Sequence, residues 1–123
     1  MQNRKSLRIL LVDDEEIVQE TIGGYLADCG HRVEKAYDGT SALKAVESND
    51  YDLALVDVRM PGIDGMSLLA RMREHHPQVA VVVITGHGNV EMAEEAHRRG
   101  AADLLVKPIS LLDLDSVLER VGG

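Results

Sequence analysis

Polar side chains follow four short apolar runs of this chain, and they are the residues best suited to chemistry. Asp57 follows one run, and the acidic cluster 13–16, Asp-Asp-Glu-Glu, follows an earlier one. Thr85 and Lys107 each end or follow a further apolar run. Carboxylates are ligands that Mg²⁺ prefers, and hydroxyl and ammonium groups bind phosphoryl oxygens. If the four points meet in the fold, they form a site for a divalent cation and a phosphoryl group.

Asp57 is the candidate nucleophile of this site. A phosphoryl acceptor must be nucleophilic, and we expect it to be exposed at the end of a strand and partly neutralised by a cation. A lone aspartate is more often a turn or capping residue. The neighbouring acids favour the nucleophile, because crowded carboxylates repel one another and a bound cation relieves that repulsion.

Asp13 and Asp14 are candidate cation ligands. Acidic residues also stabilise the amino terminus of a helix, which explains one or two members of the cluster 13–16. That explanation accounts less well for two aspartates placed directly after an apolar run. Mg²⁺ is commonly held by one or two carboxylates together with several waters. The cluster taken alone leaves both interpretations open.

Thr85 and Lys107 are candidates for binding a phosphoryl group, although either could be an ordinary strand or surface residue. The Thr85 hydroxyl can donate to a phosphoryl oxygen, and Gly86 leaves room for a phosphodonor. Lys107 can stabilise phosphoryl charge as a compact cation. Pro108 favours an extended backbone at Lys107, and the isomer of the bond between them is left open. His87 would overhang the site, and we expect no direct catalytic role for it.

Short apolar runs typical of strands alternate with amphipathic segments typical of helices. Strands are predicted over residues 8–12, 32–36, 52–56, 79–84 and 102–106. Helices are predicted over residues 15–29, 40–47, 64–75 and 89–99, and from Ser110 onward. In the last helix we expect the core to receive Leu111, Leu114, Val117, Leu118 and Val121. Strand 32–36 carries charge and is predicted at an edge of the sheet. These β-α units predict an α/β fold in which helices cover both faces of a parallel sheet and ligands bind at the carboxyl ends of the strands.

Length and composition are those of one globular domain. The chain has 123 residues, 45% apolar and 28% charged, and we predict a single domain over residues 1–123. Its core is predicted over about 7–121, with 122–123 as the possible start of a linker. The net charge of −8 argues against direct binding of nucleic acid or of anionic membranes. Cys29 is the single cysteine, the amino terminus has no signal-peptide pattern, and no apolar run is long enough to span a membrane, so we expect a cytoplasmic location.

The combination of Asp13, Asp14, Asp57, Thr85 and Lys107 resembles the receiver domain of bacterial two-component response regulators. The segment 57–65 is similar to that family's segment after the acceptor aspartate, and the likeness covers essentially the whole chain. Segment 84–90 is most similar to receivers attached to enhancer-binding transcription activators or to related DNA-binding output modules. The resemblance implies a flavodoxin-like (βα)5 three-layer sandwich whose parallel five-stranded sheet has the order 2-1-3-4-5.

The resemblance also implies a role for each matching residue. Asp57 is the phosphoacceptor, and Thr85 and Lys107 bind the phosphoryl oxygens. Asp13, Asp14, Asp57 and the backbone carbonyl of Arg59 bind Mg²⁺, for which Mn²⁺ can substitute. The positions that tune dephosphorylation are those of Arg59 and His87.

The implied partners are a sensor histidine kinase or a phosphotransfer protein on one side, and an output domain or downstream protein on the other. Phosphorylation switches the surface formed by the fourth helix, fifth strand and fifth helix, and a phosphorylation-dependent homodimer is a further expectation. Such a domain assists its own phosphorylation and dephosphorylation but is not a conventional enzyme.

One position departs from the family pattern. The residue three before Lys107 is Leu104, where the family often has an aromatic side chain that rotates together with the threonine. We therefore expect signal transfer to depend on the loop after Thr85 and on the helix that follows it. Three other functions remain as alternatives. They are a receiver-like interaction module without phosphorylation, a flavin-binding protein, which would need phosphate donors where this chain has acids, and an aspartate phosphatase, which would need a second acid where this chain has Arg59.

Overall fold

The computed structural model describes residues 6–60 and 62–122, and its centre is a parallel sheet with the strand order β2-β1-β3-β4-β5. The strands are β1 (Arg8–Val12), β2 (Arg32–Ala36), β3 (Leu53–Asp57), β4 (Ala80–Thr85) and β5 (Asp103–Val106). The helices are α1 (Glu16–Asp28), α2 (Gly39–Ser48), α3 (Gly65–His75), α4 (Val90–Arg98) and α5 (Leu111–Gly122). The predicted strand order is confirmed. Pro61 and Gly123, the latter in the predicted linker, lie outside the described residues.

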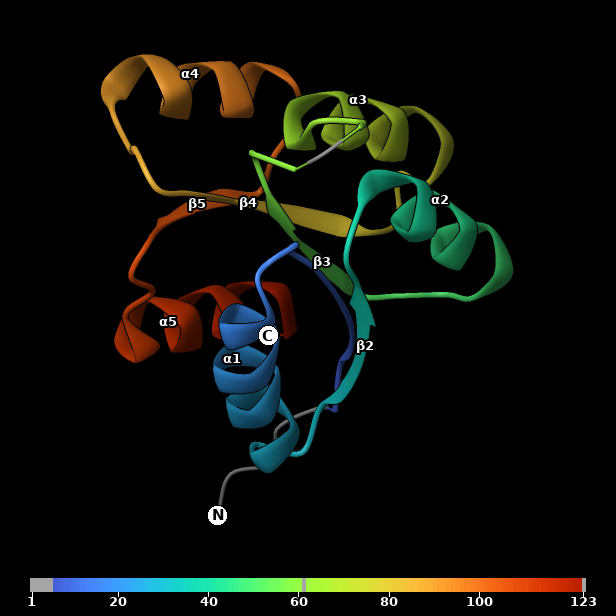
Figure 1. Cartoon of the computed structure of the whole chain (residues 1–123), viewed down its shortest axis with the longest axis vertical. Coiled ribbons are helices and arrows are strands. Elements are labelled where there is room, and N and C mark those ends of the chain that lie inside the picture. Colours follow the sequence, from blue (N-terminus) through green and yellow to red (C-terminus); the bar gives the residue numbers. More distant parts are fainter. Residues whose placement is uncertain (1–5, 61, 123) are drawn as a thin grey trace.

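Helices cover both faces of the sheet, α1 and α5 on one side and α2, α3 and α4 on the other (Figure 1). Successive side chains of a strand point to opposite faces, so each central strand contributes to two aliphatic clusters. In β3, Leu53 and Leu55 pack with α1 and α5, whereas Ala54 and Val56 pack with the other three helices. Every residue of β3 is buried, which explains why its sequence is a continuous apolar run that ends in Asp57.

Side-chain caps and left-handed glycines fix the ends of several helices. Asp38, Asp64 and Asn89 each accept a hydrogen bond of 2.7–2.8 Å from the backbone N–H three residues further on. Asp64 thus caps α3, which corresponds to the helix predicted over residues 64–75. Gly30 and Gly100 follow α1 and α4 with φ of 95° and 97°, a conformation that only glycine adopts readily.

The last helix differs from the prediction at its first residue. Leu111 is 47% exposed, so the expectation that it faces the core was wrong. It lies in the first turn of α5, three positions before Leu114, the first buried residue of the helix. Leu114, Val117 and Leu118 are buried, as expected from their spacing.

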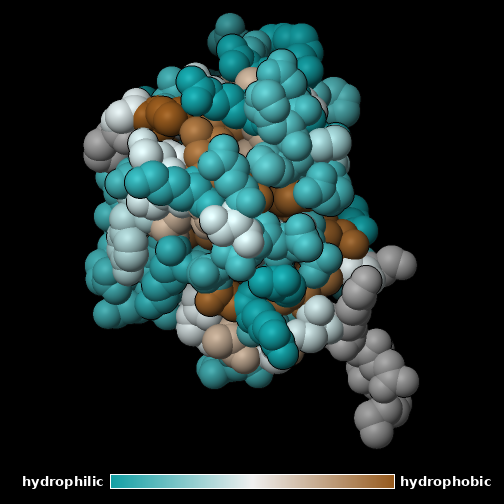
Figure 2. All heavy atoms as spheres, turned by 90° about the vertical axis from the view of Figure 1, so that its right-hand side faces the viewer, coloured by the Kyte–Doolittle hydropathy of each residue, from teal (hydrophilic) through white to brown (hydrophobic). Residues whose placement is uncertain are grey.

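The surface over α2 and β2 is largely hydrophilic, with hydrophobic residues gathered only in small areas (Figure 2). Strand β2 is an edge strand, as predicted, and its exposed side chains Arg32, Glu34 and Lys35 are charged. Charged residues on an edge discourage pairing with another sheet. Among the described residues, no helix combines the length and apolar character needed to cross a membrane.

Candidate functional site

The candidate residues lie at the carboxyl edge of the sheet, at the ends of four neighbouring strands. Asp13 directly follows β1, and Asp57 is the last residue of its neighbour β3. Thr85 ends β4, and Lys107 directly follows β5. The Lys107 N–H donates to the Thr85 carbonyl at 2.8 Å, which continues the pairing of these two strands. The winding of the chain reverses between β1 and β3, and ligands of doubly wound sheets bind at such a position.

Three carboxylates converge at this edge. Asp13, Asp14 and Asp57 each offer an oxygen atom, and these atoms lie within 4.8 Å of one another. Asp13 is fully buried and Asp57 is only 4% exposed, whereas Asp14 is open to solvent. The prediction that Asp57 is exposed was wrong, because both faces of the central strand β3 are covered. The oxygen donors of this group suit a hard divalent cation.

The carboxylate of Asp13 is oriented by a hydrogen bond to one of its oxygens, while the other oxygen accepts none within the described residues. Its Oδ1 accepts a hydrogen bond of 2.8 Å from the Glu15 N–H. Its buried Oδ2 accepts no hydrogen bond within the described residues and lies 3.2 Å from Lys107 Nζ, an ion pair without hydrogen-bond alignment. Burial raises the pKa of Asp13, the Glu15 N–H lowers it, and the charge of Asp57 raises it again, with an upward net result. A cation would favour the charged form of this acid.

Lys107 is the cation that the carboxylates share. Its Nζ lies 2.5 Å from Glu15 Oε1, 3.2 Å from Asp13 Oδ2 and 3.3 Å from Asp57 Oδ2. Burial lowers the pKa of Lys107, but the carboxylates of Glu15, Asp13 and Asp57 outweigh this effect and raise it above its ordinary value. The bond between Lys107 and Pro108, whose isomer the sequence left open, is cis. One ammonium group thus compensates three acids, one of which is fully buried.

The hydroxyl of Thr85 is tied to the loop that follows it. Thr85 is buried, and its Oγ1 accepts a hydrogen bond of 3.0 Å from the His87 N–H. The hydroxyl hydrogen remains able to donate to another acceptor. The loop continues against β5, because a Cβ added at Gly88 would overlap the side chain of Val106. Thr85 therefore joins the candidate site to the loop before α4.

The loop after Asp57 closes tightly over its backbone. The Arg59 N–H donates to Asp57 Oδ1 at 3.1 Å, and the Gly65 N–H donates to the Val58 carbonyl at 2.9 Å. A Cβ added at Gly65 would overlap the Asp57 carbonyl oxygen, so no larger residue fits there. The Arg59 side chain is exposed, and the proposed role of its backbone carbonyl stays a prediction.

Gln19 belongs to the surroundings of the site, and the sequence analysis did not identify it. It lies on α1, is fully buried, and donates from Nε2 to the carbonyls of Leu11, Asp13 and Ala36 at 3.0, 3.1 and 3.0 Å. A polar residue three positions before the buried Ile22 interrupts the apolar stripe of α1, and that interruption was the available signal.

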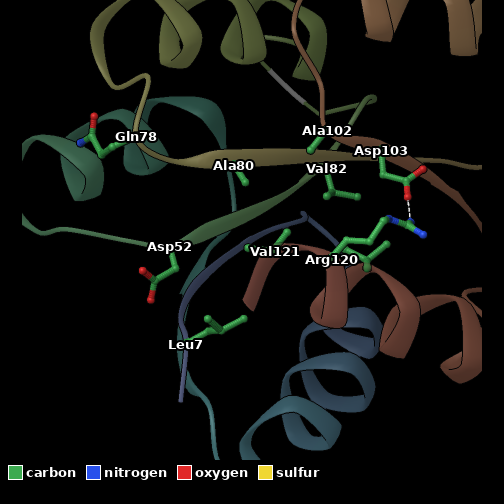
Figure 3. A pocket seen from close by; sticks show the side chains of 10 residues that line it. Leu7, Asp52, Gln78, Ala80, Val82, Ala102, Asp103, Arg120 and Val121 are labelled. Atoms are coloured by element: carbon green, nitrogen blue, oxygen red, sulfur yellow. Dashed lines mark hydrogen bonds and ion pairs between the residues drawn. The ribbon is translucent and has the colours of Figure 1, made fainter. Parts of the chain in front are cut away.

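A separate cavity of about 410 Å³ lies at the opposite, amino edge of the sheet (Figure 3). Two acidic residues that line it are already satisfied: Asp103 pairs with Arg120, and Asp52 accepts a 2.9 Å hydrogen bond from the Arg8 N–H. The aliphatic part of the lining is formed by Leu7, Ala80, Val82, Ala102, Val117 and Val121. The acids of this cavity do not converge, and we place the chemistry at the carboxyl edge.

Comparison with known families agrees with this arrangement. The family model for the response regulator receiver domain matches residues 9–119. The chain therefore belongs to the response regulator receiver family, and the resemblance inferred from its motifs is confirmed.

The chain is also similar to the amino acid sequences of several transcriptional regulators. It is 38% identical over 114 residues to the nitrogen assimilation regulatory protein NtrX of Azorhizobium caulinodans, covering 91% of this chain and 25% of that protein. It is 37% identical over 113 residues to the regulatory protein AtoC of Escherichia coli, covering 92% of this chain and 24% of that protein. The chain thus spans about a quarter of the length of these relatives.

Solved structures share the fold. The receiver domain of NtrX from Brucella abortus has a TM-score of 0.86 and 41% identity, covering 92% of this chain and 96% of that one. The chemotaxis protein CheY4 of Vibrio cholerae has a TM-score of 0.88 and 28% identity, covering 95% and 99% of the two chains. The flavodoxin-like fold inferred from the resemblance is thereby confirmed.

Proposed function

We propose that this chain is a phosphorylation-controlled switch in which Asp57 accepts a phosphoryl group from the phosphohistidine of a sensor histidine kinase or phosphotransfer protein. The observation that carries the proposal is the convergence of the Asp13, Asp14 and Asp57 carboxylates, two of which, Asp13 and Asp57, also pair with the ammonium group of Lys107. Membership of the receiver family supports it. A strongly coupled group of acids at the carboxyl edge of a parallel sheet is a typical place for catalysis and binding.

Mg²⁺ is the cofactor that we propose for this site, with Mn²⁺ as a substitute. Asp13, Asp14, Asp57 and the backbone carbonyl of Arg59 would hold it. The buried Asp13 Oδ2, which has no hydrogen bond within the described residues, is an oxygen suited to this purpose. When bound, the ion supplies positive charge that neutralises the oxygens of the transferring phosphoryl group.

The transfer begins at the carboxylate of Asp57. An oxygen of this carboxylate forms a bond to phosphorus while the bond between phosphorus and the imidazole nitrogen breaks. The imidazole keeps the electron pair of the broken bond and takes up a proton from solvent. Lys107 Nζ, 3.3 Å from Asp57 Oδ2, lies close enough to bind a phosphoryl oxygen as negative charge develops there.

Two residues then bind the phosphoryl group of the acyl phosphate. Lys107 exchanges its contact with Glu15 for a phosphoryl oxygen, and the Thr85 hydroxyl donates to another. If Thr85 rotates to do so, the hydroxyl releases the His87 N–H that it accepts in this structure. The loop before α4 would then lose one of the contacts that hold its present conformation.

We propose that α4 carries this change to an output domain or a downstream protein of transcriptional control. Ala96 is the buried residue of α4, so few apolar contacts resist a shift of this helix. Leu104 leaves no aromatic side chain to follow Thr85, which makes the loop and α4 the route of the signal. The surface that would change is formed by α4, β5 and α5. A phosphorylation-dependent homodimer would be one partner for this changed surface.

Intact-protein mass after incubation with an acyl phosphate, with and without magnesium, tests the proposal. Wild type should gain one phosphoryl group only with magnesium, and Asp57→Asn should gain none. Asp52→Asn is the matched control, because it changes the aspartate that directly precedes the same strand at its amino end, and it should label like wild type. An unlabelled but folded wild-type chain would favour the interaction module without phosphorylation, and labelled Asp57→Asn would contradict the assignment of Asp57.

A further inference from the structure

Gln19 connects the first turn of α1 to the carboxyl ends of two strands. Its Nε2 donates to the Leu11 carbonyl in β1, the Asp13 carbonyl just after β1 and the Ala36 carbonyl at the end of β2. The side chain is fully buried, so these contacts are shielded from water. Buried hydrogen bonds of this kind hold a backbone in one conformation.

The contacts of Gln19 meet those of Asp13 at the same carbonyl. The Asp13 N–H donates to the Ala36 carbonyl at 3.0 Å, and Gln19 donates both to that oxygen and to the carbonyl of Asp13. The peptide groups on both sides of the Asp13 Cα are therefore fixed. Asp13 and Asp14 are held beside Asp57 although the three carboxylates repel one another.

The chemistry of the side chain favours a role beyond filling space. Gln19 Oε1 is buried and accepts no hydrogen bond within the described residues, which is costly for a polar atom. An apolar residue of similar size would avoid that cost but would remove the amide donor from three carbonyl groups, of which the Ala36 carbonyl would keep the Asp13 N–H. The amide is therefore present for its donors, and the donors act on the backbone that carries the candidate cation ligands.

We propose that Gln19 is a positioning residue for the cation site, which keeps Asp13 and Asp14 in the ligand geometry before the cation binds. This inference rests on the proposed function, because it assigns Gln19 to the magnesium site of that function. Residues that orient metal ligands from behind commonly change metal affinity by about 10–100-fold when replaced. Gln19 makes its contacts through the backbone of a ligand, so we expect an effect at the lower end of that range.

Magnesium titration of the 123-residue chain, followed by amide NMR shifts, measures the effect. Gln19→Met should bind magnesium about tenfold more weakly than wild type. Tyr51→Phe is the matched control, since it removes a part-buried side-chain hydrogen bond to Glu34 of β2 that involves none of the candidate cation ligands. Its magnesium affinity should equal that of wild type even where its stability is lower.

A second measurement uses the wild-type chain and does not depend on the folding of a variant. The side-chain amide resonances of Gln19 should shift when magnesium binds, and those of the exposed Gln78 should not. Unchanged Gln19 resonances at saturating magnesium, or equal affinity in Gln19→Met and wild type, would overturn the inference alone. A wild-type chain that binds no magnesium would overturn the cation site of the proposed function, and the inference with it.

Discussion

The acidic side chains at the two edges of the sheet differ in how their charges are paired. At the amino edge each acid has its own partner: Asp52 accepts the Arg8 N–H, and Asp103 pairs with Arg120. At the carboxyl edge three acids, two of them buried, converge around one ammonium group. Both edges belong to one fold, so folding does not require the crowding. Excess acid at a single place therefore indicates binding, whereas matched acids indicate structure.

The largest effect is expected from a substitution at the carboxyl edge that disturbs the backbone of Asp57. Gly65→Ala should destabilise the chain by about 2–4 kcal/mol and greatly slow phosphorylation, because its Cβ would overlap the Asp57 carbonyl. Gly24→Ala is the control, since a Cβ at this exposed helical position meets nothing within 4 Å and should stabilise by roughly 0.5–1 kcal/mol. Urea denaturation measures both. A tolerated Gly65→Ala with normal labelling would show that the tight packing behind Asp57 has no importance.

The next largest effect is expected at Lys107, whose ammonium group the acids of the carboxyl edge share. Lys107→Met leaves the acids of the carboxyl edge without their ammonium partner and should destabilise the chain by on the order of 1–3 kcal/mol without magnesium. Magnesium should recover most of this loss, because it replaces the missing positive charge. Thermal unfolding with and without magnesium measures the difference. If magnesium stabilised the variant no more than it stabilises wild type, the shared-cation account would be wrong.

Sequence predicted the convergence of Asp13, Asp14, Asp57 and Lys107 because the ends of parallel strands must lie together. It could not give the direction of a single side chain. Asp57 is buried because both faces of β3 are covered, and Lys107, which is far away in the sequence, places its Nζ 3.3 Å from Asp57 Oδ2.

The sequence also could not predict the local contacts of two further residues, Thr85 and Gln19. The hydrogen bond from the His87 N–H to the Thr85 hydroxyl depends on the conformation of the loop before α4. The role of Gln19 depends on the carbonyl groups at the ends of two strands. The fold follows from periodicity, whereas these contacts depend on tertiary packing.

A smaller effect is expected at alkaline pH in the amino half of the sheet. Burial, followed by the hydrogen bond to Glu34, raises the pKa of Tyr51 to about 12 from an ordinary value of 10.0. The folded chain favours the neutral phenol of Tyr51. The stabilisation of the folded chain by this phenol is therefore fully present below pH 10 and is lost as the pH rises towards 12. We expect a loss on the order of 1 kcal/mol in wild type that is absent in Tyr51→Phe. Urea denaturation at several pH values would reveal it, and equal losses in both chains would contradict it.

The smallest effect should come from the matched pair at the amino edge. Arg120→Ala removes an ion pair with Asp103 in which the arginine side chain is 59% exposed. Exposed pairs contribute about 0–1 kcal/mol, so stability should change little. Magnesium affinity and phosphorylation should be those of wild type. A loss of either would show that the two edges are coupled and that the contrast between them is too simple.

The most direct test of the account is to locate the acyl phosphate. Borohydride reduction of the phosphorylated chain converts the modified aspartate to homoserine, which peptide mass spectrometry can place in the sequence. The account predicts homoserine at Asp57 alone, formed only when magnesium is present during phosphorylation. Homoserine at Asp13 or Asp14, or none in a chain that has gained a phosphoryl group, would contradict the assignment of Asp57 as the nucleophile.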